Sequence, residues 1–283
     1  MLPTKYRTAY NLSIIITSLI IVASAGGLFI DGLYRDNTWT TTQLRGSDLV
    51  RLLVAVPIMI TALIFTKRGS SKALLIWLGM LWLTVYDYAF FLFGAAFNVL
   101  FLIYVALFSL SILALIFALP RVDAKAIRRI FKARTPVKWI SAYMLFIAIF
   151  LGGLWTAQTL NFIVTGQLPQ SNIDSSHPTN IVFALDLALL VPGMVLAAVW
   201  LWKRRPWGYI LGAMMLVKGT IYPMALIGMA IFYYDATRIW DPLAWFWIVF
   251  TAVSLMASAV FFGNIGSSRE QVDSPVQGEP VGT

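Results

Sequence analysis

The chain of 283 residues has no cysteine and a single histidine, His177. The absence of cysteine excludes disulfides, thiolate metal sites and thiol nucleophiles. One histidine excludes bis-histidine haem ligation and multi-histidine metal centres. The sequence contains neither a glycine-rich phosphate loop nor a nucleophile-elbow motif. We therefore expect no cofactor, no metal and no catalytic residue, and the sequence disfavours an enzyme.

Charged residues are also scarce, at 12% of the chain, whereas apolar residues make up 60%. This composition lies far outside the range of soluble globular proteins. A search for apolar runs long enough to cross a bilayer finds eight: Tyr10–Ile30, Leu49–Thr66, Ala73–Gly94, Val99–Leu119, Trp139–Thr165, Ile181–Trp202, Gly208–Tyr234 and Leu243–Asn264. The predicted fold is an all-α polytopic transmembrane helical bundle of eight spans.

The basic residues are distributed unevenly between the two sides of these spans. Of the 21 Lys and Arg, 16 lie on one side, Arg35, Arg45, Arg51 and Arg238 lie on the other, and the remaining one, Lys218, lies within a span. The positive-inside rule then places both termini in the cytoplasm. The net charge of +9 reflects this orientation and attraction to anionic lipid headgroups, so we expect no nucleic acid partner. Although Ala23-Ser24-Ala25 resembles a signal cleavage site, the apolar run continues to Ile30, which favours an uncleaved span.

The order of spans and linkers predicts two transmembrane halves. Residues 1–119 form the first four-helix half and residues 139–264 the second, and a basic cytoplasmic linker, 120–138, joins them. Within the linker, Val122–Arg134 has the pattern of a basic amphipathic helix lying on the inner headgroups; a solvated basic connector is the alternative. The polar tail, 265–283, is predicted to be a disordered cytoplasmic segment.

Similar motifs in the two halves indicate a possible 4+4 parallel duplication. An Asp-Leu pair, a proline and a basic exit occur in the second span and again in the sixth, at Asp48, Pro57 and Lys67 and at Asp186, Pro192 and Lys203. A repeat of four spans keeps its orientation, so the pseudo-two-fold axis would follow the membrane normal. The repeat roughly matches Asp87 in the third span with Lys218 in the seventh.

Three buried charges are the strongest functional signal. At 1.5 Å per residue, Lys218 falls near the midplane of its span, while Asp87 and Asp186 fall in the outer halves of theirs. An ionised group at such depth is costly and needs a partner or a function. Since helices can be joined by cheaper polar groups, we favour a binding or coupling role for these residues.

Other polar side chains share the outer half of the bilayer: Tyr88, Trp155, Gln158, Asn161 and Tyr222. This pattern predicts an outward-facing polar cavity, floored near Lys218 and lined by aromatic and amide groups. For Gln158 and Asn161 alone, hydrogen bonds between helices are the favoured alternative.

Some polar residues and prolines have simpler interpretations. Asp48 and Arg51, three residues apart, are interpreted as an interfacial ion pair, and His177 as an exposed loop residue. Pro57, Pro192 and Pro223 are expected to kink their helices and can free backbone carbonyls for contact with a ligand or ion.

Several stretches also carry a family resemblance: Tyr86-Asp87-Tyr88-Ala89-Phe90, Phe93–Asn98, Leu102–Ser111, Leu185-Asp186-Leu187 and Arg204–Tyr209. They resemble a family of uncharacterised multi-pass membrane proteins of bacteria, over most of the chain from the second span to the seventh. The resemblance implies a bacterial source and a location in the cytoplasmic (inner) membrane. It assigns no activity and no residue roles.

Two functions compete on this evidence. The first is a small-molecule transporter, coupled to a proton or ion, in which an aspartate exchanges Lys218 for a proton or a substrate cation. The alternative is a membrane-embedded ligand-binding or sensory protein that signals through its basic cytoplasmic loop. A lipid-modifying enzyme fits less well, because such enzymes place several histidines or acids near an interface.

Overall fold

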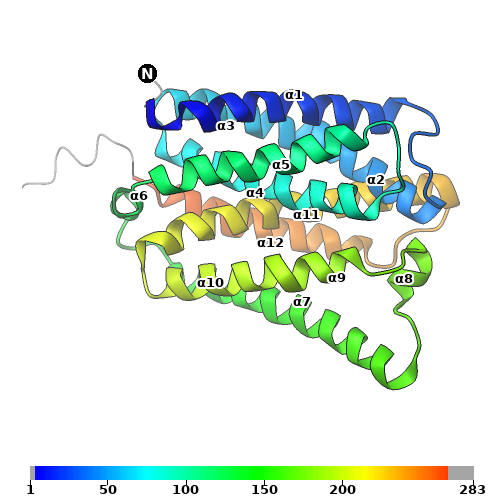
Figure 1. Cartoon of the computed structure of the whole chain (residues 1–283). Coiled ribbons are helices and arrows are strands. Elements are labelled where there is room, and N and C mark those ends of the chain that lie inside the picture. Colours follow the sequence, from blue (N-terminus) through cyan, green and yellow to red (C-terminus); the bar gives the residue numbers. More distant parts are fainter. Residues whose placement is uncertain (1–3, 267–283) are drawn as a thin grey trace, which may run out of the picture.

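The structure, a computed structural model, describes residues 4–266 as a bundle of helices (Figure 1). In chain order they are η1 (Thr4–Tyr6), α1 (Arg7–Phe29), α2 (Thr38–Val50), η2 (Arg51–Ala55), α3 (Val56–Lys67), α4 (Ser71–Gly94), α5 (Phe101–Ala118), η3 (Leu119–Arg121), α6 (Ala124–Ile130), α7 (Val137–Thr165), α8 (Gln170–Ser175), α9 (Ile181–Leu185), η4 (Asp186–Leu190), α10 (Val191–Trp202), α11 (Pro206–Thr237) and α12 (Ala244–Gly263). Both η2 and η4 are π-helices.

Among residues 4–266, eight helical segments are long and apolar enough to cross a membrane, which confirms the predicted all-α transmembrane fold. A helix suits this setting because it satisfies its backbone polar groups internally. The largest difference from the prediction is the second span, which begins at Thr38 instead of Leu49. A hydropathy search misses α2 because this helix is rich in Thr, Gln and Ser. Its start is fixed by Asn37, whose side chain accepts a hydrogen bond from the Thr40 N–H.

The bundle has two distinct ends (Figure 1). Both ends of the described chain lie at the same end as α6, which we call the α6 end. The opposite end carries the short helix α8, and we call it the α8 end. The C-terminal part of α7 diverges from the other helices (Figure 1), and beyond Ala148 this helix has no buried residue. The α8 end is therefore the more open part of the bundle.

Helices α4 and α11 form the centre of the bundle. In their most apolar windows, 78% and 61% of the residues are buried, compared with 28% in α7 and in α12. The two helices approach closely at Gly79, where an added β-carbon would lie 2.6 Å from the Val217 Cβ. Only glycine permits this contact without a shift of the backbone. The close approach holds α4 and α11, which carry Asp87 and Lys218, against each other.

Two helical hairpins of the bundle match residue for residue. A shift of 135 residues, from Arg51 to Asp186, superimposes the bounds of η2 on those of η4 and of α3 on those of α10, and it also relates the starts of α4 and α11. The turns match too, because Gly69 and Arg204 both have positive φ. This register pairs Arg51 with Asp186 and Asp87 with Tyr222, so it differs from the sequence match of Asp87 with Lys218. Elsewhere the matched helices differ in length.

The basic linker departs from its predicted placement. Helix α6 forms, but Val122, Ile127 and Phe131 around it are buried in the bundle. The Phe131 ring lies 4.7 Å from the ring of Tyr209 and 4.8 Å from that of Phe261. The apolar side of this segment therefore packs on protein, not in lipid.

The tail begins with ordered backbone contacts instead of the predicted disorder. The Gly266 N–H donates to the Ile130 carbonyl at 2.8 Å, and Ile265 forms an isolated antiparallel bridge with Phe131. The rest of the predicted disordered segment, from residue 267 onward, lies outside the described residues.

Candidate functional site

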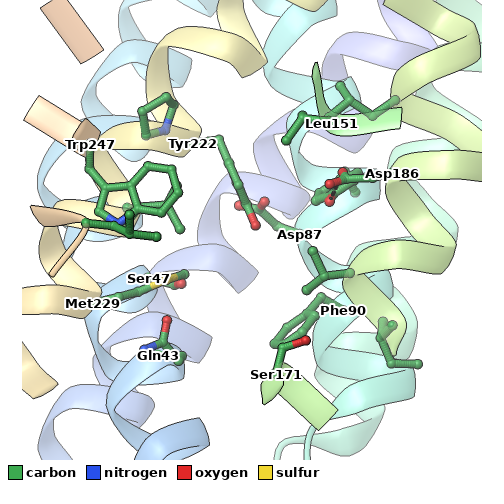
Figure 2. Close-up of a pocket in the computed structure, with 18 of the residues that line it drawn as sticks. Gln43, Ser47, Asp87, Phe90, Leu151, Ser171, Asp186, Tyr222, Met229 and Trp247 are labelled. Atoms are coloured by element: carbon green, nitrogen blue, oxygen red, sulfur yellow. Dashed lines mark hydrogen bonds between the residues drawn. The ribbon is translucent and has the colours of Figure 1, made fainter. Parts of the chain in front are cut away.

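A cavity of about 620 Å³ extends from α8 into the middle of the bundle. Its walls come from α2, η2, α4, α7, α8, α9, η4, α10, α11 and α12, and the buried Lys218 is among its lining residues. In Figure 2, Tyr222, Asp87 and Asp186 point into one shared space, with Gln43 and Ser47 on one side and Phe90 and Ser171 on another. A cavity at Lys218 is therefore present, as the sequence predicts, but most of its lining is apolar, so the predicted polar character is wrong.

The two π-helices place one charged residue each on the cavity wall. Pro57 and Pro192 follow the π-helices by two residues and lack an N–H, so each interrupts the regular ladder. The ladder continues across five residues, because the Val56 N–H donates to the Arg51 carbonyl and the Val191 N–H to the Asp186 carbonyl. Such π-bulges often occur at functional sites. Here the first residue of each, Arg51 or Asp186, lines the cavity.

The proline in α11 acts on the same cavity. Pro223 lies inside this helix and cannot donate to the carbonyl four residues earlier, which belongs to Gly219. Gly219 lines the cavity next to Lys218. The sequence expectation that a proline frees a carbonyl for a ligand thus has a definite location.

Arg51 joins two carboxylates in a network that we call the Arg51 cluster: Tyr34, Asp48, Arg51 and Asp87. The guanidinium donates from Nη1 to Asp48 at 2.8 Å and from Nε to Asp87 at 3.1 Å. Its carbon also lies 4.3 Å from the ring centroid of Phe91. The predicted Asp48–Arg51 pair is confirmed, but both residues are buried in the bundle, so it is not an exposed interfacial pair.

The Tyr34 hydroxyl closes the Arg51 cluster by donating to Asp48. Burial raises the pKa of Tyr34, and the neighbouring Asp48 charge raises it further, so Tyr34 stays a neutral donor. Helix α1 fits tightly here, because a β-carbon at Gly27 would collide with both Asp48 and Tyr34. Every member of the cluster thus has a direct polar partner, and its charges are held rigidly.

A second group forms the deep wall of the cavity, and we call it the Lys218 cluster: Tyr86, Trp155, Asp186, Lys218 and Tyr222. Asp186 accepts one hydrogen bond from the Tyr86 hydroxyl at 2.6 Å and another from the Trp155 Nε1 at 2.9 Å. The Trp155 ring stacks on Phe183 with centroids 4.3 Å apart. Asp186 is buried, and both of these donors are uncharged.

Lys218 is only 1% exposed, yet it contacts aromatic rings instead of an acid. Its Nζ lies 3.6 Å from the Tyr86 ring centroid and 4.1 Å from that of Tyr222. Within residues 4–266, no carboxylate oxygen lies within 4.0 Å of this nitrogen. Tyr86 therefore stands between the ammonium, on its ring face, and Asp186, at its hydroxyl. The expected partner of Lys218, Asp87, bonds to Arg51 instead.

The wide end of the cavity is organised by α8. Asn37 fixes this helix by donating to the Asp174 carbonyl at 2.7 Å. His177, predicted to be exposed, is turned inward: it lines the cavity, its side chain is 14% exposed, and its Nε2 lies 4.0 Å from Asp36. Burial raises the pKa of Asp36, while the Ala96 N–H and His177 oppose this shift.

Five of the eight predicted site residues line the cavity: Asp87, Trp155, Asp186, Lys218 and Tyr222. The other three do not. Tyr88 lies on another face of α4, where its ring packs on Phe91 and Tyr104. Gln158 and Asn161 lie on the diverging part of α7, and the Asn161 side chain is exposed. Their helical spacing with Trp155 predicted that Gln158 and Asn161 line the same cavity. This prediction failed because α7 leaves the bundle beyond Trp155.

Several lining residues were not predicted from the sequence. Gln43 and Ser47 lie in α2, outside the expected span, although they precede Arg51 at intervals of four residues on one helix face. That spacing was a usable signal. No comparable spacing identified Trp247 as a lining residue, because its side chain is positioned by a hydrogen bond that it donates to Asp241 in the preceding loop.

Comparison of the chain with protein-family models, with curated proteins and with solved structures gives no match.

Proposed function

We propose that the protein is a small-molecule transporter coupled to a proton or another ion. The observation that carries this proposal is the position of Lys218, a costly buried cation that lies deep in a cavity against aromatic rings. A charge that only joins helices is expected to be paired, as Arg51 is with Asp48 and Asp87. The lack of such a pair favours a role of Lys218 toward a ligand.

We assign the coupling to Asp186. Asp87 bonds directly to the Arg51 guanidinium, whereas Asp186 accepts hydrogen bonds from the uncharged groups of Tyr86 and Trp155. A change of partner at Asp186 therefore breaks no ion pair. A ligand that alters the charge near Lys218 would act on Asp186 through Tyr86, which both residues contact.

The matching hairpins support alternation between two halves. Each is bent at a π-helix that bears a cavity residue, Arg51 in η2 and Asp186 in η4. Transporters built from repeats bind substrate at the interface between halves and move one against the other. In the proposed cycle, these two hairpins move relative to each other.

The same proposal places the protein in the bacterial cytoplasmic membrane, with both termini in the cytoplasm. The basic residues of the loops at the α6 end support this orientation. The cavity, which begins at the α8 end, then opens to the outside. The basic α6 end faces the anionic headgroups of the inner leaflet.

Uptake into proteoliposomes tests the transport proposal. Vesicles with wild-type protein, Lys218→Met protein or no protein receive a defined mixture of small acids, amines and neutral compounds, and mass spectrometry quantifies their contents. We expect at least one compound to accumulate in wild-type vesicles above both controls, and its uptake to depend on a proton or ion gradient. Accumulation of no compound above the Lys218→Met vesicles would contradict transport.

A receptor is the second candidate, because α11 connects the cavity to the α6 end. This helix carries Lys218 and also Tyr209, whose ring contacts Phe131 beside α6. Arg204 adds a hydrogen bond of 3.2 Å to the Thr135 carbonyl. A ligand that moves α11 would thereby reach the basic linker. Ligand-dependent thermal stabilisation without flux would favour this function.

A further inference from the structure

We propose that the ligand of this cavity is an organic anion, a single carboxylate on an apolar body, which binds with its charged group at Lys218. The proposal rests on the proposed function because it concerns the same cavity, but it names the chemical class of the ligand. It also applies to a receptor, since it concerns binding and not movement across the membrane.

The charges of the cavity point to an anion. Four carboxylates line it, and each accepts a hydrogen bond from a side chain: Asp87 from Arg51, Asp174 from Gln170, Asp186 from Tyr86 and Trp155, and Asp241 from Trp247. Arg51 is likewise paired. Of the Lys and Arg side chains that line the cavity, Lys218 alone has no carboxylate within 4.0 Å among the described residues. Asp174, Asp186 and Asp241 also have no cation within 4.0 Å among the described residues, but each accepts a hydrogen bond. Lys218 has neither a carboxylate nor an acceptor among those residues, so the charged group without a polar partner is the cation.

The donors of Lys218 are also unused. An ammonium carries three N–H donors, and no hydrogen bond from Lys218 to an acceptor of the described residues is formed. The faces of Tyr86 and Tyr222 attract the charge, but a ring face does not replace an oxygen acceptor. Burial of such a group without acceptors is unfavourable. A ligand carboxylate would supply both the acceptors and the counter-charge.

The same contacts argue against an organic cation. Aromatic faces can bind quaternary ammonium groups, but here Lys218 itself occupies the faces of Tyr86 and Tyr222. A second cation would meet the Lys218 charge at close range. The four lining carboxylates equally disfavour a ligand with several negative charges. One negative group, placed at Lys218, fits both restrictions.

The walls of the cavity define the rest of the ligand. Apolar side chains, among them Phe90, Leu151, Met229 and Trp247, surround the space around the charged groups (Figure 2). A volume of about 620 Å³ lies in the range of sites that enclose drug-sized ligands. The body of the ligand is therefore apolar, either aromatic or branched aliphatic. Its carboxylate lies at the deep end of the cavity, next to Lys218.

Binding of matched compounds tests this inference without requiring transport. The full-length protein in lipid nanodiscs is titrated with 2-naphthylacetate, 2-(2-naphthyl)ethanol and 2-(2-naphthyl)ethylamine, which share the naphthyl group. It is then titrated with 4-phenylbutyrate, 4-phenylbutanol and 4-phenylbutylamine. The proteins are wild type, Lys218→Met and the control Lys138→Met, whose lysine is exposed in the first turn of α7. Calorimetry gives each affinity, and thermal denaturation checks that each variant is folded.

We expect the wild-type protein and Lys138→Met to bind at least one of the two acids tenfold or more tightly than its alcohol. Lys218→Met should bind acid and alcohol equally while keeping the affinity for the alcohol. Equal binding of acid and alcohol by wild type in both series, preference for an amine, or an unchanged preference in Lys218→Met would overturn the proposal. Binding of an acid without flux would support the anion site and refute transport. Flux of an amine would support transport and refute the anion site.

Discussion

The Arg51 cluster and the Lys218 cluster occupy neighbouring parts of one cavity but treat a buried cation in opposite ways. Arg51 donates to two carboxylates, and a tyrosine hydroxyl holds one of them in place. Lys218 has two tyrosine ring faces and no carboxylate within ion-pair distance among the described residues. A fully paired charge is what helix fastening requires, whereas an unpaired one is available to a ligand. We therefore propose a structural role for Arg51 and a ligand-binding role for Lys218.

The matching hairpins sharpen this contrast. Arg51 and Asp186 occupy the first position of equivalent π-helices, with opposite charges. Arg51 has two carboxylates as direct ion partners, whereas Asp186 accepts hydrogen bonds only from neutral donors. The same backbone feature therefore presents an ion-paired charge in one hairpin and a charge bonded only to neutral groups in the other.

The largest expected effect is loss of stability in Arg51→Met. Removing the guanidinium leaves Asp48 and Asp87 buried without their counter-charge, which we expect to cost about 3–5 kcal/mol. Unfolding by SDS titration in mixed micelles measures it, with Arg128→Met on the exposed side of α6 as the control. If Arg51→Met were as stable as the wild-type protein, the structural role of Arg51 would be contradicted.

A smaller loss is expected for Tyr86→Phe. The substitution deletes the hydroxyl that donates to Asp186 at 2.6 Å but keeps the ring under Lys218. Hydrogen bonds to charged groups contribute about 1.5–3 kcal/mol, and Trp155 still donates to the carboxylate. The same titration should therefore show a loss clearly below that of Arg51→Met. A loss as large as that of Arg51→Met would mean that the Lys218 cluster is also a fastening network.

Asp186→Asn should change coupling more than stability. Tyr86 and Trp155 donate to different oxygens of Asp186. In the asparagine variant the amide oxygen can still accept from Trp155, and the amide NH2 can donate to the hydroxyl oxygen of Tyr86. We therefore expect the free energy of unfolding to change by less than in Tyr86→Phe. Because an amide cannot take up a proton, uptake into proteoliposomes should lose its dependence on a proton gradient. Asp87→Asn is the matched comparison, and it should retain that dependence. Retained gradient dependence in Asp186→Asn would place the coupling elsewhere.

The fold was largely predictable from the sequence, because eight apolar runs of sufficient length leave few alternatives in a bilayer. The start of the second span was not predictable, because α2 is polar. This helix continues into the membrane-spanning helix through its packing against α11, where Gly46 meets the backbone of Met229. The free energy required to bury an ionised group in a membrane identified Asp87, Asp186 and Lys218 as candidate site residues, and all three line the cavity. Their partners could not be derived, because side-chain pairing depends on helix rotation. Hence Arg51, and not Lys218, pairs with Asp87.

The most direct test of the account measures Arg51→Met and Lys218→Met side by side, for the free energy of unfolding and for binding of 2-naphthylacetate and 4-phenylbutyrate relative to their alcohols. The account predicts that Arg51→Met is strongly destabilised. It predicts that Lys218→Met is at least as stable as wild type, because methionine removes a buried charge at similar volume, and that this variant no longer prefers the acid. A loss of stability in Lys218→Met as large as in Arg51→Met, with the acid preference intact, would contradict it.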